Sequence, residues 1–336
     1  MGGMLRRCAN WDYRQRGIYM VTLTVEGRRP LLGSLVGGEA AASVAPSAAG
    51  EWVAACWREI PERFPGVTLM ESQLMPDHFH GIVFVREPQK KPLGAIVGAF
   101  KSHSTSLFLH AARGEIHAAR GMAQDEAVLC PAARGGGAGG PSPPALWSPG
   151  FQDTILFHKG QLAAMRAYVL DNPRRLAVKR AHPDLFRIVR DLPCAGARFV
   201  AIGNHFLLAY PVKRQVQCSR SVAPEALAGQ EAELLAAARH GAVLVSPCIS
   251  PGEKRIARTA LAAGRPLIVL LENGFPPLYK PPKTYFEACA AGRLLMLAPW
   301  PHHTDKRPIT REQCLALNSF AKAIAGEGEP CTPKTT

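Results

Sequence analysis

The sequence lacks several features that mark common protein classes. No stretch approaches the roughly 20 consecutive apolar residues that a membrane-spanning helix needs, so we expect no membrane segment. Arg6 and Arg7 are not followed by an apolar segment and therefore do not form an export signal. The 9 cysteines include no Cys-x-x-Cys pair, which argues against a zinc ribbon or a dithiol redox motif. We interpret them as reduced, structural thiols and expect a cytoplasmic protein.

Acidic residues are also scarce, because 26 Asp and Glu stand against 40 Lys and Arg. The resulting net charge of +14 favours a polyanionic partner. Nucleic acid is the favoured partner and a membrane surface is not, since the arginines are scattered rather than gathered on one amphipathic helix. The 336 residues suffice for two domains with a core in each.

A pair of histidines lies in the segment Pro76 to Val85, which continues into an apolar, β-branched run typical of a buried strand. Successive side chains of a strand point to opposite faces. His78 and His80 are therefore expected to share a face, with Phe79 pointing the other way. Two imidazoles on one side of a strand provide half of a metal site, although such a pair is often structural.

The elements before this strand indicate the kind of domain that holds it. Residues 18–25 predict a first strand, residues 51–63 an amphipathic helix and residues 67–74 a further strand. The last of these is expected to pair with the histidine strand as a hairpin. The order strand, helix, strand, strand is typical of an α+β sandwich with helices on one face.

A second segment of interest contains Tyr168 and Asn172. The apolar pattern predicts a helix from Lys159 to Asp171, which we expect to end there because the residue before Pro173 avoids the helical region. Four residues separate Tyr168 from Asn172, a spacing that places both side chains on one helix face. The alternative interpretations are a half-buried structural tyrosine and an asparagine that caps the helix.

Together these motifs resemble the single-tyrosine HUH transposases of insertion sequences. The order His78-Phe79-His80, then Lys101-Ser102 on a following helix, then Tyr168 with Asn172-Pro173, is most similar to the REP-associated tyrosine transposases. The resemblance covers roughly residues 17–179. It implies an α+β domain with an antiparallel sheet and helices, the HUH or ferredoxin-like palm, which we place at residues 1–190.

The resemblance also implies a reaction. His78, His80 and Asn172 would hold one Mg²⁺ or Mn²⁺ ion, and Tyr168 would attack single-stranded DNA beside a hairpin or palindromic repeat. The product would be a 5′-phosphotyrosine and a 3′-hydroxyl, so the expected activity is that of a transposase or a metal-dependent single-stranded DNA endonuclease. Alternatives are a nickase of the replication-initiator type and a non-catalytic DNA-binding protein derived from a transposase.

DNA contacts are expected from basic and small polar residues near these motifs. The candidates follow the first predicted strand, lie on the predicted helix from Leu93 to His110, or follow the tyrosine: Arg28, Arg29, Lys101, Ser102, Arg174 and Arg175. Residues 113–149 interrupt this domain with a Gly/Pro-rich stretch that we interpret as a flexible insertion.

The second half of the sequence alternates predicted strands and helices over residues 196–326, and residues 327–336 are expected to be a disordered tail. The predicted strands are 199–202, 206–210, 243–246, 267–271 and 294–297, and the predicted helices are 224–239, 254–263, 285–291 and 311–324. This alternation predicts a parallel, doubly wound α/β sheet. The region loosely resembles the Rossmann-like domain of DNA-processing protein A, without a clean glycine fingerprint.

A ligand loop is predicted in this second domain at the carboxyl ends of its strands. Its candidate residues are Ser246, Ser250, Gly252, Lys254 and Gly274. Two interpretations stay open, a site for a nucleotide or a DNA end and a protein-contact module. A homodimer also stays open, and the expected location is the cytoplasm in association with the nucleoid.

Overall fold

The computed structural model describes residues 8, 10–112, 145–305 and 308–326. The chain divides into two compact units, residues 1–177 and 178–336. The division falls near the end of helix α4 (Gln161–Ala181). Most of the predicted insertion, residues 113–144, and the whole predicted tail lie outside the described residues.

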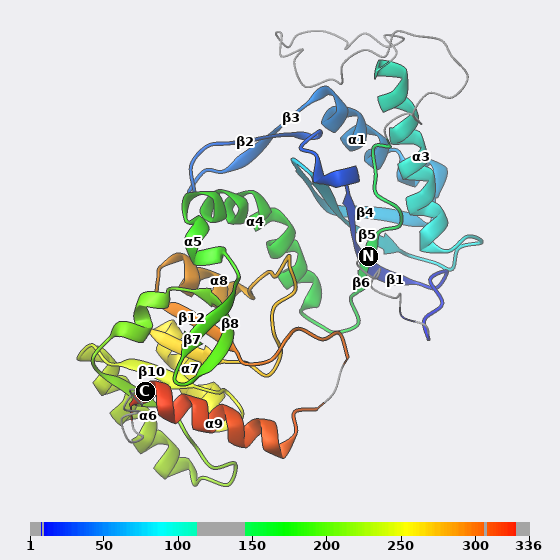
Figure 1. Cartoon of the computed structure of the whole chain (residues 1–336). Coiled ribbons are helices and arrows are strands. Elements are labelled where there is room, and N and C mark those ends of the chain that lie inside the picture. The colour runs from blue at the N-terminus through cyan, green and yellow to red at the C-terminus, as the bar shows by residue number, and fades with distance from the viewer. Residues whose placement is uncertain (1–7, 9, 113–144, 306–307, 327–336) are drawn as a thin grey trace. The chain divides into compact units, whose positions relative to one another are not determined.

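Unit 1 contains a four-stranded antiparallel sheet with the strand order β4-β5-β1-β6 (Figure 1). Its strands are β1 (Gly17–Thr24), β4 (Val67–Met75), β5 (His78–Val85) and β6 (Gln152–Ile155). The antiparallel pairing of β4 with β5 confirms the predicted hairpin. A separate hairpin of β2 (Gly33–Val36) and β3 (Ser43–Pro46) was not predicted.

Helices α1 (Ala48–Arg58) and α3 (Leu93–Ala112) pack on one face of this sheet. A short helix α2 (Ile60–Arg63) follows α1, so the single helix predicted over 51–63 is interrupted at Glu59. The indole of Trp57 on α1 contacts the ring of Phe79 at 4.9 Å between centroids. A Cβ atom at Gly81 would lie 2.2 Å from that indole, which explains why glycine occupies this strand position.

Helix α4 continues through Pro173, and the prediction that it ends at Asp171 is wrong. A proline in a helix cannot donate to the carbonyl four residues earlier, which here belongs to Val169. The side-chain Nδ2 of Asn172 donates to that carbonyl at 3.3 Å and to the carbonyl of Tyr168 at 2.7 Å. The asparagine therefore satisfies the backbone group that the proline leaves without its donor, and the helix persists.

Unit 2 contains a six-stranded mixed sheet with the order β7-β8-β12-β11-β10-β9. Its strands are β7 (Val189–Cys194), β8 (Ala197–Gly203), β9 (Lys213–Gln215), β10 (Val243–Ser246), β11 (Leu267–Leu270) and β12 (Leu294–Ala298). The last four are mutually parallel, whereas β8 runs antiparallel to β12 and β7 antiparallel to β8. A wholly parallel sheet was therefore the wrong expectation, and the predicted strand 206–210 is a 3₁₀ helix, η2 (His205–Ala209).

Helices cover both faces of the unit 2 sheet, which accounts for the complete burial of β10 and β11. Helices α6 (Pro224–Arg239), α7 (Pro251–Ala262) and α8 (Lys283–Ala290) pack on one face, and α9 (Arg311–Ala325) packs on the other. A short helix α5 (Pro183–Phe186) packs beside α8. Across the described parts of the chain, no helix combines the length and apolarity needed to cross a membrane.

Candidate catalytic site

The two histidines of β5 lie on the face of the unit 1 sheet opposite its core helices, as the alternation predicted. Phe79 packs among Trp57 and Phe100, whereas the ring of His80 contacts the ring of Tyr168. The imidazole centroids of His78 and His80 are 4.7 Å apart, and the ring planes are nearly perpendicular at 87°. Both side chains are buried, His80 almost completely at 1% exposure.

Each imidazole is oriented through its Nδ1 atom. The Nδ1 of His78 lies 2.6 Å from Oδ1 of Asp77, and the Nδ1 of His80 lies 2.8 Å from the hydroxyl of Thr22 on the neighbouring strand. Metal-binding histidines show this arrangement, in which an oxygen partner on one nitrogen fixes the ring and the other nitrogen binds the ion. Sequence reasoning missed both partners, although Asp77 directly precedes His78.

Asp77 connects the histidine pair to a basic residue. Its Oδ2 accepts a hydrogen bond from Nη1 of Arg28 at 3.2 Å. Burial alone would raise the pKa of Asp77, but the hydrogen bond with His78 and the contact with Arg28 outweigh burial and lower the pKa to about 2. Asp77 is therefore a carboxylate over the whole physiological pH range.

The helix α4 brings Tyr168 to the histidines. The rings of Tyr168 and His80 are 5.9 Å apart between centroids, and the guanidinium carbon of Arg175 lies 5.8 Å from the centroid of the tyrosine ring. An ion pair between Arg166 of α4 and Glu71 of β4 joins this helix to the sheet two residues before the tyrosine. No sequence motif indicated this pair, since Glu71 lies in an ordinary strand pattern.

Asn172 lies one helical turn beyond Tyr168 and is buried at 7% exposure. Because its Nδ2 donates to two helix carbonyls, its Oδ1 is the atom that a cation would bind. The structure thus brings the rings of His78, His80 and Tyr168 together. Asn172 lies on the same helix as Tyr168, four residues further along the chain.

The predicted ligands of a divalent cation are two imidazoles and one amide oxygen. Within the described ranges, no group of three His, Cys, Asp or Glu side chains could hold a metal ion. The predicted site would therefore depend on Asn172 to complete the histidine pair. Two imidazoles and one amide oxygen would leave coordination positions open for phosphate oxygens and water, and the choice of Mn²⁺ or Mg²⁺ stays a prediction.

Two of the predicted DNA-binding residues after β1 make contacts within the protein. Arg28 donates a hydrogen bond to the carboxylate of Asp77, and Arg29 donates to the carbonyls of Glu26 and Ala145 at 3.1 and 3.0 Å. Arg28 also has a left-handed backbone, with φ of 56°. Their role in DNA binding stays a prediction.

On α3, the ammonium of Lys101 donates to the carbonyls of Ser148 and Gly150 at 2.7 and 2.8 Å. Burial lowers the pKa of this lysine. Lys101 thereby fixes the segment that leads into β6, whereas its neighbour Ser102 is exposed. DNA contact by either residue stays a prediction.

The two arginines after the tyrosine differ in their surroundings. Arg174 forms a two-pronged ion pair with Asp171, at 2.6 and 3.2 Å. Arg175 is buried at 6% exposure and lies over the ring of Tyr168. Of the two, Arg175 is therefore the one adjacent to the candidate nucleophile.

The predicted ligand loop of unit 2 spans the end of β10 and the start of α7. Ser246 is fully buried and accepts from the backbone N–H of Cys248, while Ser250 caps α7. Gly252 is buried where a Cβ would touch Cys218, and Lys254 is exposed. Gly274 belongs to a different segment, where a Cβ would come within 2.6 Å of the backbone nitrogen of His302.

No family model matches this chain. A relative described as an uncharacterized protein of Haemophilus influenzae is 29% identical over 120 residues, covering 30% of this chain. The chain spans 64% of the length of that relative.

Three solved structures show low similarity. A REP-associated tyrosine transposase bound to a REP hairpin gives a TM-score of 0.32 at 13% identity, covering 52% of this chain and 73% of that chain. DNA processing protein A of Helicobacter pylori, described with its single-stranded DNA binding mode, gives a TM-score of 0.32 at 18% identity. The match covers 41% of this chain and 65% of that chain. A transposase candidate of Deinococcus radiodurans gives a TM-score of 0.26 at 15% identity. The match covers 50% of this chain and 98% of that chain. TM-scores below 0.5 do not establish a shared fold, so the function proposed for this chain depends on its own residues.

Proposed function

We propose that unit 1 is a metal-dependent strand transferase that cleaves single-stranded DNA with Tyr168 as the nucleophile. The observation that carries the proposal is the contact between the rings of Tyr168 and His80 at the face of the sheet where His78 also lies. A phosphoryl transfer of this kind needs a nucleophile next to a bound metal ion. Tyr168 would supply the nucleophile, and the two adjacent imidazoles would bind the ion.

Each residue of the site has a role in this proposal. His78, His80 and Asn172 would hold the divalent ion, which when bound polarises the scissile phosphate. Thr22 and Asp77 fix the two imidazoles. The ion pair between Glu71 and Arg166, together with the guanidinium of Arg175, positions the helix and the ring of Tyr168.

The reaction conserves the energy of the phosphodiester bond. The phenolic oxygen of Tyr168 forms a bond to phosphorus, the bond to the 3′ oxygen breaks, and that oxygen takes a proton as the phenol loses one. A 5′-phosphotyrosine and a 3′-hydroxyl result, and a second strand's 3′-hydroxyl can reverse the step without ATP. The proposed substrate, a single strand beside a hairpin or palindromic repeat, follows from the resemblance of the His78-to-Pro173 motifs to single-tyrosine transposases.

The decisive experiment is to incubate the full chain with labelled hairpin-bearing single strands and Mn²⁺. We expect a protein–DNA adduct that survives SDS. Tyr168→Phe should abolish the adduct and retain DNA binding, whereas Tyr210→Phe, which alters a half-exposed tyrosine of unit 2, should behave as wild type.

Two outcomes would contradict the proposal. Normal cleavage by Tyr168→Phe would exclude this tyrosine as the nucleophile. DNA binding by the wild type with no adduct on any hairpin substrate would leave a DNA-binding protein that does not cleave.

A further inference from the structure

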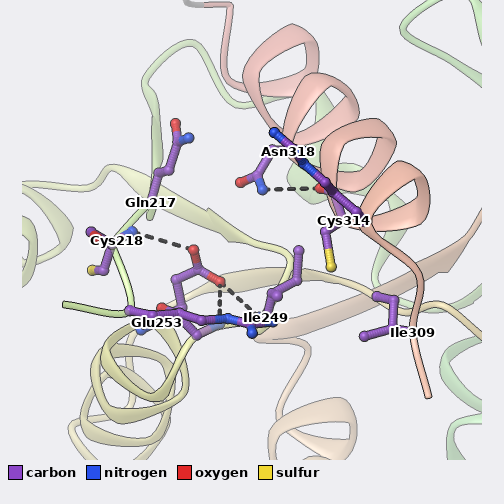
Figure 2. A pocket seen from close by; sticks show the side chains of 11 residues that line it. Gln217, Cys218, Ile249, Glu253, Ile309, Cys314 and Asn318 are labelled. Carbon is purple, nitrogen blue, oxygen red and sulfur yellow. Dashed lines mark hydrogen bonds between the residues drawn. The ribbon is translucent and has the colours of Figure 1, made fainter.

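Unit 2 contains a cavity of about 620 Å³ between the ends of two parallel strands and helix α9 (Figure 2). Its walls come from three segments: residues 217–220 after β9, residues 249–253 at the start of α7, and residues 309–318 at the start of α9. Open α/β sheets commonly bind ligands at the carboxyl ends of their strands. The volume is in the range of small-molecule sites.

The N-terminus of α7 is not available to a ligand in this cavity, because the protein's own Glu253 occupies it. One carboxylate oxygen accepts from the backbone N–H of Cys218 at 3.2 Å, and the other accepts from those of Ile249 and Ser250 at 2.7 and 3.0 Å (Figure 2). Glu253 is buried at 2% exposure. An external phosphate would have to displace this carboxylate to reach the donors that a helix N-terminus usually offers.

Two exposed arginines contribute positive charge to the cavity walls. Arg220 and Arg311 both line the cavity, and neither forms an ion pair with a carboxylate anywhere in the described ranges. Glu253 is the acidic side chain of the lining, and its oxygens are already committed to backbone donors. A guanidinium group suits a phosphate, because it can bind two phosphate oxygens in a two-pronged manner.

Asn318, which lines the cavity, contains a buried acceptor. Asn318 donates from Nδ2 to the carbonyl of Cys314 at 3.0 Å, which assigns the orientation of its amide. Its Oδ1 is buried and has no hydrogen-bond partner among the described residues. In Figure 2 this oxygen points from α9 toward Gln217. A buried acceptor in a cavity wall costs stability unless a ligand or water donates to it.

We propose that this cavity binds the terminal phosphate of a nucleotide whose base carries an amino group. Arg220 and Arg311 bind the phosphate, and Oδ1 of Asn318 accepts from the amino group. The thiol of Cys218 takes no covalent part, because burial and the nearby Glu253 raise its pKa and it donates to Oε1 of Gln230. The inference does not depend on the reaction proposed for unit 1. Its ligand is either a free nucleotide or the 5′ end of a DNA strand.

Calorimetric titration of the full chain carrying Tyr168→Phe, in EDTA, tests this while unit 1 chemistry is silent. The probes are dAMP, dTMP, and one oligonucleotide ending in adenosine with either a 5′-phosphate or a 5′-hydroxyl. We expect binding of dAMP or of the phosphorylated oligonucleotide. Binding of dAMP identifies a free nucleotide as the ligand. Binding of the phosphorylated oligonucleotide that neither dAMP nor the 5′-hydroxyl oligonucleotide shows identifies a DNA end.

Variants then assign the residues. Arg220→Ala and Arg311→Ala should each weaken binding at least about tenfold, while Arg239→Ala, an exposed arginine at the end of α6 outside the cavity, should have no effect. Asn318→Ala should remove the preference for dAMP over dTMP. The proposal would be overturned if dAMP does not bind and the 5′-phosphate does not strengthen binding of the oligonucleotide, or if both arginine variants bind these probes as wild type does.

Discussion

The ring of Tyr168 lies edge-on to the ring of His80, with 5.9 Å between their centroids. The two residues belong to α4 and β5, which are far apart in the sequence, and the contact places a phenol beside a buried imidazole. The Nδ1 atom of that imidazole is hydrogen-bonded to the hydroxyl of Thr22. The contacts around this pair, and those around α7, can each be tested by substitution.

Thr22 should control the affinity for the metal. Thr22→Ala removes the hydroxyl that fixes the His80 ring, and loss of such a partner typically weakens metal binding by roughly 10–100-fold. Thr22→Ser should restore binding, because the hydroxyl returns. The measurement is the Mn²⁺ concentration needed for half-maximal cleavage, with Thr154→Ala, which alters an exposed position of β6, as the control. An unchanged Mn²⁺ requirement in Thr22→Ala would contradict the assignment.

Asp77 should make stability depend on pH in the acid range. Its pKa is lowered to about 2 from the ordinary value of 3.8, so the carboxylate stabilises the fold fully above about pH 4 and loses this effect as the pH falls toward 2. Asp77→Asn should cost about 2 kcal/mol at pH 7 and nearly nothing near pH 2. Urea unfolding of wild type and Asp77→Asn between about pH 2 and pH 7 measures this cost. A difference in unfolding free energy that does not vary with pH would refute the prediction.

The ion pair between Glu71 and Arg166 should matter more for cleavage than for stability. Arg166 is half exposed, so breaking the pair should cost under about 1 kcal/mol in the free energy of unfolding. Displacement of the tyrosine helix should nevertheless slow adduct formation by roughly tenfold or more. Glu71→Arg should show this loss, and the exchange Glu71→Arg with Arg166→Glu should recover most of it. Equal loss in the exchanged pair would argue against a positioning role.

Asn172 and Pro173 should be energetically coupled. Asn172→Ala leaves the carbonyl of Val169 without its donor, at a cost of about 1 kcal/mol or more. In a Pro173→Ala background the same change should cost less, because the alanine would supply a backbone N–H to that carbonyl. A double-mutant cycle of unfolding free energies measures the coupling. Strict additivity would show that the asparagine does not replace the missing donor.

Glu253 should be replaceable by an external anion. Glu253→Ala removes the acceptor of three backbone N–H groups and should lower the melting temperature of unit 2. Acetate should partly restore the melting temperature, because a small carboxylate can bind the exposed helix N-terminus. The same anion should raise the melting temperature of wild type less, since Glu253 already occupies the helix N-terminus. Identical gains in both proteins would show that Glu253 does not hold this position.

The local pattern of the sequence was sufficient for most of the secondary structure. Period-two alternation placed His78 and His80 on one face and Phe79 on the other, because a strand's geometry alone decides it. Helix α6 begins and ends as predicted, since Pro224 marks its first turn. The segment 206–210, by contrast, has an apolar composition that a strand and a short 3₁₀ helix share.

Other features depended on residues that are distant in sequence and meet only in the folded chain. The sequence could not show that Asn172 would bond the carbonyl left by Pro173, nor that β7 and β8 would join the parallel strands in antiparallel orientation. The pairing of Glu71 with Arg166 is likewise invisible along the chain. The sequence by itself determined which side chains are candidates for the chemistry, because side-chain chemistry and strand or helix periodicity are local. Only the tertiary structure decided which of them meet, because that depends on packing between elements that no local pattern encodes.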